Sequence, residues 1–200
     1  SWIWPRDPDF EQKAGLILDL YHGSWKGEPL ETNDYVICAD EKTSIQARHP
    51  LMPTVPPMPG RPGRLEHEYE RKGALAYLAA WDAHRGKVFG LCCASTGIAN
   101  FHNLVHLVMN QQPYRSARRV FWITDNGSSH RGQTSIDRLQ TWYPNAVLVH
   151  THIHASWLNQ VEIYFSILQR KVLTPNDFEH LGELESKILS FQSLYETSAV

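Results

Sequence analysis

The clearest absences in this sequence concern membranes and metal-binding cysteines. No apolar run approaches the roughly 20 residues that a membrane-spanning helix needs, and no signal peptide is visible. The three cysteines, Cys38, Cys92 and Cys93, have no metal-ligand spacing and lie in apolar runs. We therefore expect buried, reduced thiols, a cytoplasmic location and no contact with a membrane.

An excess of positive charge is absent as well. The chain has 19 Lys and Arg against 21 Asp and Glu, a formal net charge of −2, whereas free-standing nucleic-acid binders are usually basic. The candidates for phosphate contacts come in local groups: Arg61 and Arg64, Arg118 and Arg119, and Arg170 with Lys171. A solvated surface explains each group equally well. Composition therefore permits DNA binding without indicating it.

What is present is the composition of a folded domain. The 200 residues, 42% hydrophobic with seven Trp, support one domain with a core. Apolar runs predict strands at 35–40, with 41–48 as an extension, at 120–123 and at 146–149, and a hairpin formed by 75–82 and 87–95. Helical periodicity predicts helices at 9–21, 98–110, 132–143, 156–175 with Ser156 as the N-cap, and 178–195. Residues 50–63 hold six of the twelve prolines, so we expect no regular element there. This order predicts an α/β fold, a mixed sheet flanked by helices.

Three carboxylates lie where such a sheet can bring them together. Asp40 ends the apolar run YVICAD, Asp125 ends VFWIT, and Glu162 lies at the border of the apolar stripe of a later amphipathic helix, near Asn159 and Ser166. Each taken alone is an ordinary strand-end or helix-surface residue. Together they are typical of a site for Mg²⁺ or Mn²⁺, because clustered carboxylates repel one another without cations and hard cations prefer oxygen ligands. The chemistry that fits is two-metal phosphodiester cleavage.

Three segments resemble the catalytic blocks of DDE transposases, in particular the insertion-sequence branch of the mariner superfamily. They are ICADEKTSIQAR, VFWITDNGSSHRG and HASWLNQVEIYFSILQRKVL, and the third is the most specific. The resemblance extends to PGRPGRLEHEYERKG and DPDFEQK, so it covers most of the chain. Thirty-six residues, 126–161, separate Asp125 from Glu162, a spacing within the range of this family.

The resemblance implies a ribonuclease H-like fold whose metal-holding triad is Asp40, Asp125 and Glu162, with two Mg²⁺ or Mn²⁺ ions. It implies supporting roles for Asn126, His130, His154, Ser156 and Asn159. It divides the chain into an N-terminal helix and linker (1–34), a catalytic domain (35–175) and a C-terminal helix (176–200).

The resemblance also implies the biology of a mobile element. Such transposases bind the terminal inverted repeats of their own insertion sequence, cut both strands and join the freed 3′-hydroxyls to target DNA at TA. The implied partners are DNA and a second copy of the chain, in the bacterial cytoplasm and on the nucleoid during the reaction. Relatives carry an N-terminal helix-turn-helix region, and this chain starts after its expected place. We therefore expect weak specific DNA recognition; a fragment, a truncated reading frame and an expressed catalytic domain all stay open.

Two local alternatives concern other metal ligands. His150, His152 and His154 alternate, so on a strand they share a face that suits zinc. No fourth ligand is close in sequence, and no carboxylate follows at a metallohydrolase spacing, so we favour histidines at a strand end beside a DNA-facing cleft. Glu41 follows Asp40 and points to the opposite face if the strand continues.

Two alternative functions stay open at this stage. One is another nuclease or integrase of the ribonuclease H-like fold, which differs in the DNA ends that it processes. The other is a catalytically silent transposase remnant that binds only DNA or a partner. The intact triad argues against the second alternative, and the missing recognition region keeps it open.

Overall fold

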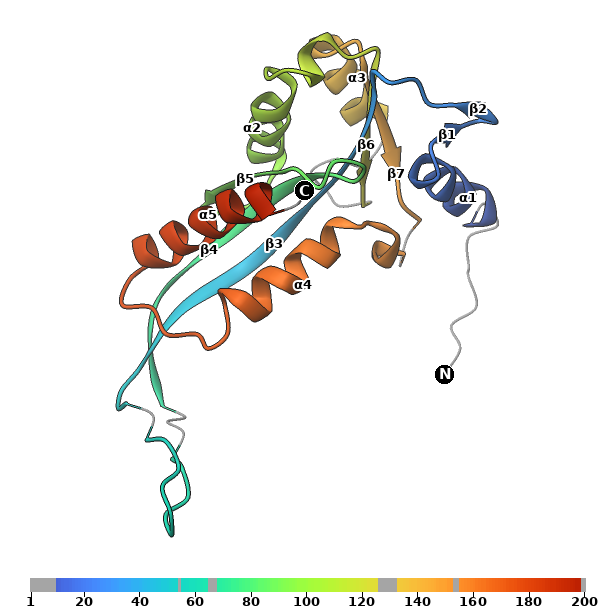
Figure 1. Ribbon diagram of the computed structural model, residues 1–200. Coiled ribbons are helices and arrows are strands. Elements are labelled where there is room, and N and C mark those ends of the chain that lie inside the picture. The colour runs from blue at the N-terminus through green and yellow to red at the C-terminus, as the bar shows by residue number, and fades with distance from the viewer. Residues whose placement is uncertain (1–9, 54, 65–67, 126–132, 153–154, 199–200) are drawn as a thin grey trace.

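The protein is built on a five-stranded mixed sheet with helices on both faces (Figure 1). A computed structural model describes residues 10–53, 55–64, 68–125, 133–152 and 155–198. The strands lie in the order β5-β4-β3-β6-β7. Their bounds are β3 (Asp34–Pro50), β4 (Tyr69–Asp82), β5 (Val88–Cys93), β6 (Arg119–Thr124) and β7 (Ala146–His150). A small separate sheet pairs β1 (Ser24–Trp25) with β2 (Glu28–Pro29).

Strand direction divides the main sheet into two parts. β3, β4 and β5 form an antiparallel meander, while β6 and β7 run parallel to β3 and to each other. β6 reads RVFWIT and its last five residues are buried, as expected of a central strand covered on both faces. The predicted α/β mixed sheet is confirmed, and so is the hairpin, which is formed by β4 and β5.

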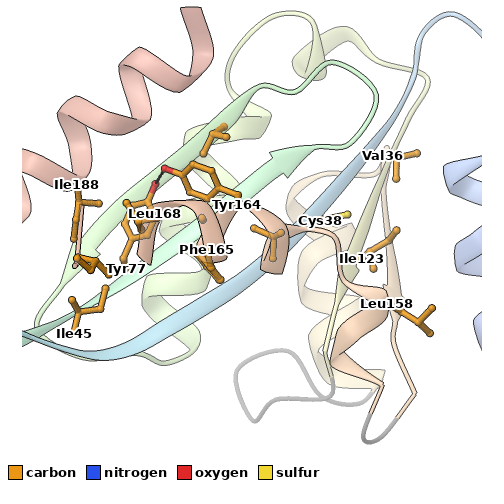
Figure 2. Close-up of a cluster of buried hydrophobic side chains, with 14 of the residues drawn as sticks. Val36, Cys38, Ile45, Tyr77, Ile123, Leu158, Tyr164, Phe165, Leu168 and Ile188 are labelled. Carbon is orange, nitrogen blue, oxygen red and sulfur yellow. Dashed lines mark hydrogen bonds between the residues drawn. The ribbon is translucent and has the colours of Figure 1, made fainter. Parts of the chain in front are cut away.

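Five α-helices in the described part of the chain cover the two faces of the sheet (Figure 1). α1 (Phe10–Tyr21), α4 (Val161–Lys171) and α5 (Leu181–Ser198) pack on one face, which we call the α4 face. α2 (Ile98–Met109) and α3 (Gln133–Trp142) pack on the other, the α2 face. Each face has its own buried apolar cluster. Figure 2 shows the cluster on the α4 face, where Tyr164 and Phe165 of α4 lie against Tyr77 of β4.

The alternation of side chains along β3 decides which residues face which helix. Val36 and Cys38 belong to the cluster on the α4 face, and Ile37 and Ala39 to the cluster on the α2 face. A bulge between Lys42 and Ile45 then shifts this alternation by one residue, because Ile45 also faces α4.

β3 and β4 continue past the ends of β6 and β5 as a two-stranded arm (Figure 1). β6 pairs only with Asp34–Cys38, whereas β4 pairs with β3 as far as Pro50. Beyond Pro50 the described part of the proline-rich segment has only two isolated bridges, Val55 with Arg64 and Met58 with Arg61. The prediction that 50–63 holds no regular element is therefore confirmed, apart from Pro50 itself, which ends β3.

The predicted helix from Ser156 to Pro175 is wrong at its start. Ser156–Leu158 form a short 3-10 helix, and α4 begins only at Val161 after Gln160. Ser156 is therefore not the N-cap of α4. Asn159 between them has an extended backbone (φ −83°, ψ 104°), which no continuous helix tolerates.

Other predictions have mixed outcomes. Cys38, Cys92 and Cys93 are free cysteines; Cys38 is buried, but Cys92 and Cys93 are only partly so. None of the described helices has the length and apolar character that spanning a bilayer requires. The predicted division at residues 34 and 175 stays a prediction, although Ile17 of α1 and Leu184 of α5 share one buried cluster with the sheet.

Candidate active site

Asp40 lies in β3, and Asp125 directly follows the neighbouring strand β6. The last parallel pair between β3 and β6 is Cys38 with Ile123. Two residues further on, β3 reaches Asp40 and the chain leaving β6 reaches Asp125. Adjacent paired strands are about 4.8 Å apart, and Asp40 and Asp125 each follow two residues after this last pair.

The two aspartates also belong to the same face of the sheet. Cys38 and Ile123 both lie in the cluster on the α4 face, and side chains two residues apart on a strand share a face. This alternation places Asp40 and Asp125 on the α4 face and Glu41 on the α2 face, as expected for Glu41. The Asp40 carboxylate accepts a hydrogen bond from the main-chain N–H of Glu41, 2.7 Å away.

Glu162 is held near these residues by the segment that precedes α4. The side-chain amide of Asn159, which is buried, donates a hydrogen bond of 2.9 Å to the main-chain carbonyl of Ala39. The main-chain N–H of Glu162 in turn donates to the carbonyl of Asn159, 3.1 Å away. The first turn of α4 is thus linked to the residue next to Asp40. Glu162 is exposed in that turn, where the helix dipole favours an acidic side chain.

Tyr21, the last residue of α1, holds the same segment from the other side. Its hydroxyl donates a hydrogen bond of 2.6 Å to the carbonyl of Leu158 and accepts one of 3.4 Å from the N–H of Gln160. Burial raises the pKa of Tyr21, so the hydroxyl stays protonated. It also lies 3.3 Å from the sulfur of Cys38, whose pKa is raised by burial to about 11. Sequence reasoning missed Tyr21, because no motif connects a residue of α1 to this segment.

The donor chemistry suits hard divalent cations, although no ligand cluster is preformed. Among the described residues, no three His, Cys, Asp or Glu side chains are grouped so that they could hold a metal ion. The oxygen donors of Asp40, Asp125 and Glu162 are of the type that Mg²⁺ and Mn²⁺ accept. Carboxylates repel one another when no cation lies between them, so a fully closed cluster is not expected without the ion.

Comparison with known proteins identifies the family of the chain. The model of the DDE superfamily endonuclease family matches residues 35–185. The chain belongs to this family. No curated protein matches it.

Solved structures show the same fold for this DDE superfamily endonuclease. The crystal structure of the Mos1 mariner paired-end complex with Mn has a TM-score of 0.67 at 15% identity and covers 100% of this chain. The crystal structure of a pre-cleavage Mos1 transpososome has a TM-score of 0.64 at 15% identity, again over 100% of this chain. The Mos1 strand transfer complex gives 0.56 at 14% identity. The ribonuclease H-like fold is confirmed. The chain spans 61%, 62% and 65% of the three Mos1 chains, respectively.

The predicted supporting residues of the DDE endonuclease divide into two groups. Asn126, His130 and His154 lie outside the described residues. Ser156 is exposed at the start of the 3-10 helix, and its main-chain carbonyl accepts a hydrogen bond of 2.8 Å from the N–H of Asn159. Asn159 links the α4 segment to β3. Its Oδ1 is buried and has no hydrogen-bond partner in the described part of the chain.

β7 does not continue as a strand to His152. β7 ends at His150, whose Nδ1 lies 3.4 Å from the carbonyl oxygen of Asp125 and 3.5 Å from Oγ1 of Thr124. His152 is buried and its ring packs edge-on against Phe10, with the centroids 5.0 Å apart. The alternating arrangement proposed for zinc is therefore not formed by His150 and His152. His150 lies beside Asp125 at the strand end, as the preferred interpretation expected.

Arg118 and Arg119 have structural partners at the opposite end of β6 from Asp125. Arg119 donates two hydrogen bonds to buried Asp34, of 3.2 and 2.7 Å. Arg118 forms ion pairs with Asp34, 3.4 Å away, and with Glu31. Burial acts to raise the pKa of Asp34, but the bonds from Arg119 and from the N–H of Glu31 lower it on balance. These partners give both arginines a structural role, and contact with DNA stays a prediction for them.

The other predicted cationic residues are more accessible. Arg61 and Arg64 are exposed near the tip of the arm. Arg170 and Lys171 are exposed in the last turn of α4, where Arg170 donates a hydrogen bond of 3.1 Å to Ser166. Contact of these four residues with DNA also stays a prediction.

A polar groove of about 430 Å³ lies between β3 and the end of α4. It follows the part of β3 beyond its pairing with β6, and its lining includes Lys42, Ser44, Gln46, Gln169 and Thr174. Lys42 is two residues from Asp40 and lies before the bulge, so both belong to the same face. Sequence reasoning treated 41–48 only as a strand extension, since nothing in the spacing of these residues signals a groove.

Proposed function

We propose that this chain is the catalytic domain of a transposase of the insertion-sequence branch of the mariner superfamily. The proposed activity is metal-dependent cleavage of DNA strands at transposon ends, followed by transfer of the 3′-hydroxyl into target DNA. The observation that supports it is the parallel pairing of β3 with β6 up to Cys38 and Ile123, two residues before Asp40 and Asp125, together with the bond from Asn159, before α4, to Ala39. Membership of the DDE superfamily endonucleases supports it.

The roles of the carboxylates follow from this placement. Asp40 and Asp125 extend from the rigid centre of the sheet, and Glu162 approaches from α4, so the three together would hold two Mg²⁺ or Mn²⁺ ions. When bound, such ions lower the pKa of a water or a 3′-hydroxyl and stabilise the leaving oxygen of an in-line displacement. Asn159 and Tyr21 fix the segment before Glu162, and in this way they would position Glu162.

The proposed partners are DNA and a second copy of the chain. Solved structures of the same fold are Mos1 paired-end complexes with Mn and with Mg, and a Mos1 strand transfer complex. The polar groove beside Asp40 supports DNA as the partner, because Lys42 and several amide and hydroxyl groups line it. Paired ends in turn support a dimer on DNA.

The test is nicking of supercoiled plasmid DNA in Mn²⁺, which relaxes the geometric demands of Mg²⁺. The wild-type chain should nick the plasmid, and Asp125→Asn should not. Asp19→Asn, which changes an exposed aspartate of α1, is the matched control and should nick like the wild type. Equal nicking by wild type and Asp125→Asn would exclude the proposed centre.

The two alternative functions predict other results. A silent remnant would bind plasmid DNA with no nicking, and its binding would not change on removal of Asp40, Asp125 and Glu162 together. Another nuclease of this fold would nick with the same dependence on Asp125 but would not join a 3′-hydroxyl to target DNA, so a strand-transfer assay with a pre-cleaved oligonucleotide end separates it from a transposase. An integrase would join a 3′-hydroxyl as well, and it differs in the DNA ends that it processes, so the same assay with different end sequences separates it.

A further inference from the structure

Trp157 is an aromatic side chain that the protein leaves in solvent close to the candidate active site. It is 68% exposed, more than any other large hydrophobic residue in the described part of the chain. It lies in the 3-10 helix five residues before Glu162. Burial of a large apolar ring is favourable, so a persistently exposed indole at this place calls for an explanation.

Ser156 directly before Trp157 is exposed, but the turn around the two residues is held by buried and bonded neighbours, so the exposure of Trp157 does not come from a loose segment. Ala155, Leu158 and Asn159 are all buried. The carbonyl of Leu158 accepts from the Tyr21 hydroxyl, and the Asn159 side chain donates to Ala39. The main-chain N–H of Leu158 also donates to the carbonyl of Ala155, 3.0 Å away. The turn is thus fixed from two directions and presents the indole outward.

A second exposed apolar residue lies on the other side of Glu162. Ile163, in the first turn of α4, is 53% exposed. The Asn159 bond places this whole segment next to Ala39 and Asp40. Exposed apolar side chains therefore lie on both sides of Glu162 in the sequence, where a purely phosphate-binding site would present only polar and cationic groups.

We propose that Trp157 stacks against a nucleobase of the DNA strand whose phosphodiester lies at the carboxylates. This inference rests on the proposed function. A strand held there by its phosphate must also carry bases past the neighbouring residues, and every base offers a flat π-face to an aromatic ring. A base that is unstacked from its neighbours regains part of the lost stacking on the indole. Trp157 thereby orients the strand relative to Glu162.

The test is a binding comparison with two labelled single strands of equal length and charge. One is a thymine oligonucleotide of roughly 12 nucleotides, within the site sizes of single-strand grooves, and the other is an abasic strand. Fluorescence anisotropy with Ca²⁺ as the divalent ion gives the affinity for each. We expect the wild type to bind the thymine strand about 5- to 150-fold more tightly than the abasic strand. Trp157→Ala should lose this preference, and Trp157→Phe should keep most of it.

Trp142→Ala is the matched control. Trp142 is also an exposed tryptophan, 55% accessible, but it belongs to α3, where it stacks on His106 with the centroids 4.6 Å apart. The variant should keep the wild-type preference for the thymine strand. Thermal unfolding of each variant confirms that the fold is intact.

Several results would overturn the proposal. One is a wild-type chain with no preference for the thymine strand; another is a Trp157→Ala variant that loses affinity for both strands equally. A lower oligomeric mass for Trp157→Ala with an unchanged preference would assign the indole to a contact between copies. Plasmid nicking by the wild type, measured in parallel, separates the two proposals. Nicking without a base preference removes only the stacking role, and a base preference without nicking removes only the catalytic one.

Discussion

The Asn159 side chain donates a hydrogen bond to the carbonyl of Ala39, a residue 120 positions earlier in the chain. This bond reaches β3 on the side that β6 no longer covers, since β6 pairs only as far as Cys38. The bond fixes the point along β3 at which the chain enters α4, and the direction of its entry. Because Glu162 follows within one helical turn, its position relative to Asp40 depends on a bond that neither carboxylate makes.

Asn159→Ala should therefore lower both stability and nicking. Loss of a buried hydrogen bond leaves the Ala39 carbonyl unsatisfied, at a cost of about 1–3 kcal/mol. Urea unfolding measures this cost, and plasmid nicking measures the effect on Glu162. Asn103→Ala is the matched control, because Asn103 is an exposed asparagine of α2. A variant with wild-type stability and nicking would show that the bond does not position α4.

Removal of a carboxylate should abolish the stabilisation that a bound metal ion gives. A ligand that binds only the folded state raises its unfolding temperature. We expect Mn²⁺ to raise the Tm of the wild type, an effect that EDTA reverses, and to raise it much less in Asp40→Asn and Glu162→Gln. Differential scanning fluorimetry with and without Mn²⁺ is the measurement, with Asp19→Asn as control. Equal Mn²⁺ shifts in all four proteins would exclude the assigned ligands.

The ion pair of Asp34 with Arg119 should make stability dependent on acidic pH. Hydrogen bonds from Arg119 and Glu31 outweigh burial and lower the pKa of Asp34 from its ordinary value of 3.8. The stabilisation is therefore complete above the unfolded pKa and is lost as pH falls through the lower folded pKa. Asp34→Asn should cost about 2 kcal/mol near neutrality, and the difference should shrink below about pH 4. Urea titrations over this range test it; a difference that stays constant with pH would contradict it.

Two glycines should respond to alanine in opposite directions. A Cβ at Gly90 of β5 would lie 2.6 Å from two ring carbons of Tyr77, which is fully buried and bonded to Tyr164 and Gln192. Gly90→Ala should cost about 1–3 kcal/mol through overpacking. Gly15, in α1, has open space around its Cβ position, so Gly15→Ala should stabilise by about 0.5–1 kcal/mol. The urea midpoints of both variants measure these changes in stability. A Gly90→Ala variant with wild-type stability would contradict the close packing of Gly90 against Tyr77.

The sheet was predictable because its central strands correspond to short apolar runs in the sequence. Residues 35–39 and the run VFWIT are buried in the structure. Asp125 directly follows the end of β6, whereas β3 continues past Asp40 to Pro50. The order of elements predicted a mixed sheet, but it did not predict that β3 and β6 are parallel neighbours, the pairing that brings the chain to Asp40 and Asp125.

The segment before α4 was not predictable in the same way. Leu158 and Val161 have helical spacing, so periodicity extends the helix back to Ser156, yet Asn159 has an extended backbone. The bond to Ala39 and the Tyr21 hydroxyl decide that conformation. Tertiary contacts of this kind override local propensity. The bulge between Lys42 and Ile45 was missed for the same reason, because Ser44 reaches a positive φ of 54° only in its tertiary context.

The central strand has consequences for how the protein folds. β3 pairs on one side with β4, which follows it closely in sequence, and on the other with β6, where Cys38 meets Ile123. Closing the loop between Cys38 and Ile123 costs conformational entropy before the contacts between the two strands form. Folds that are rich in contacts between residues far apart in sequence form slowly. During synthesis the ribosome delivers β3 and β4 well before β6 and α4. For that interval the longest strand of the protein has an open edge, and this is when the nascent chain is most exposed to aggregation.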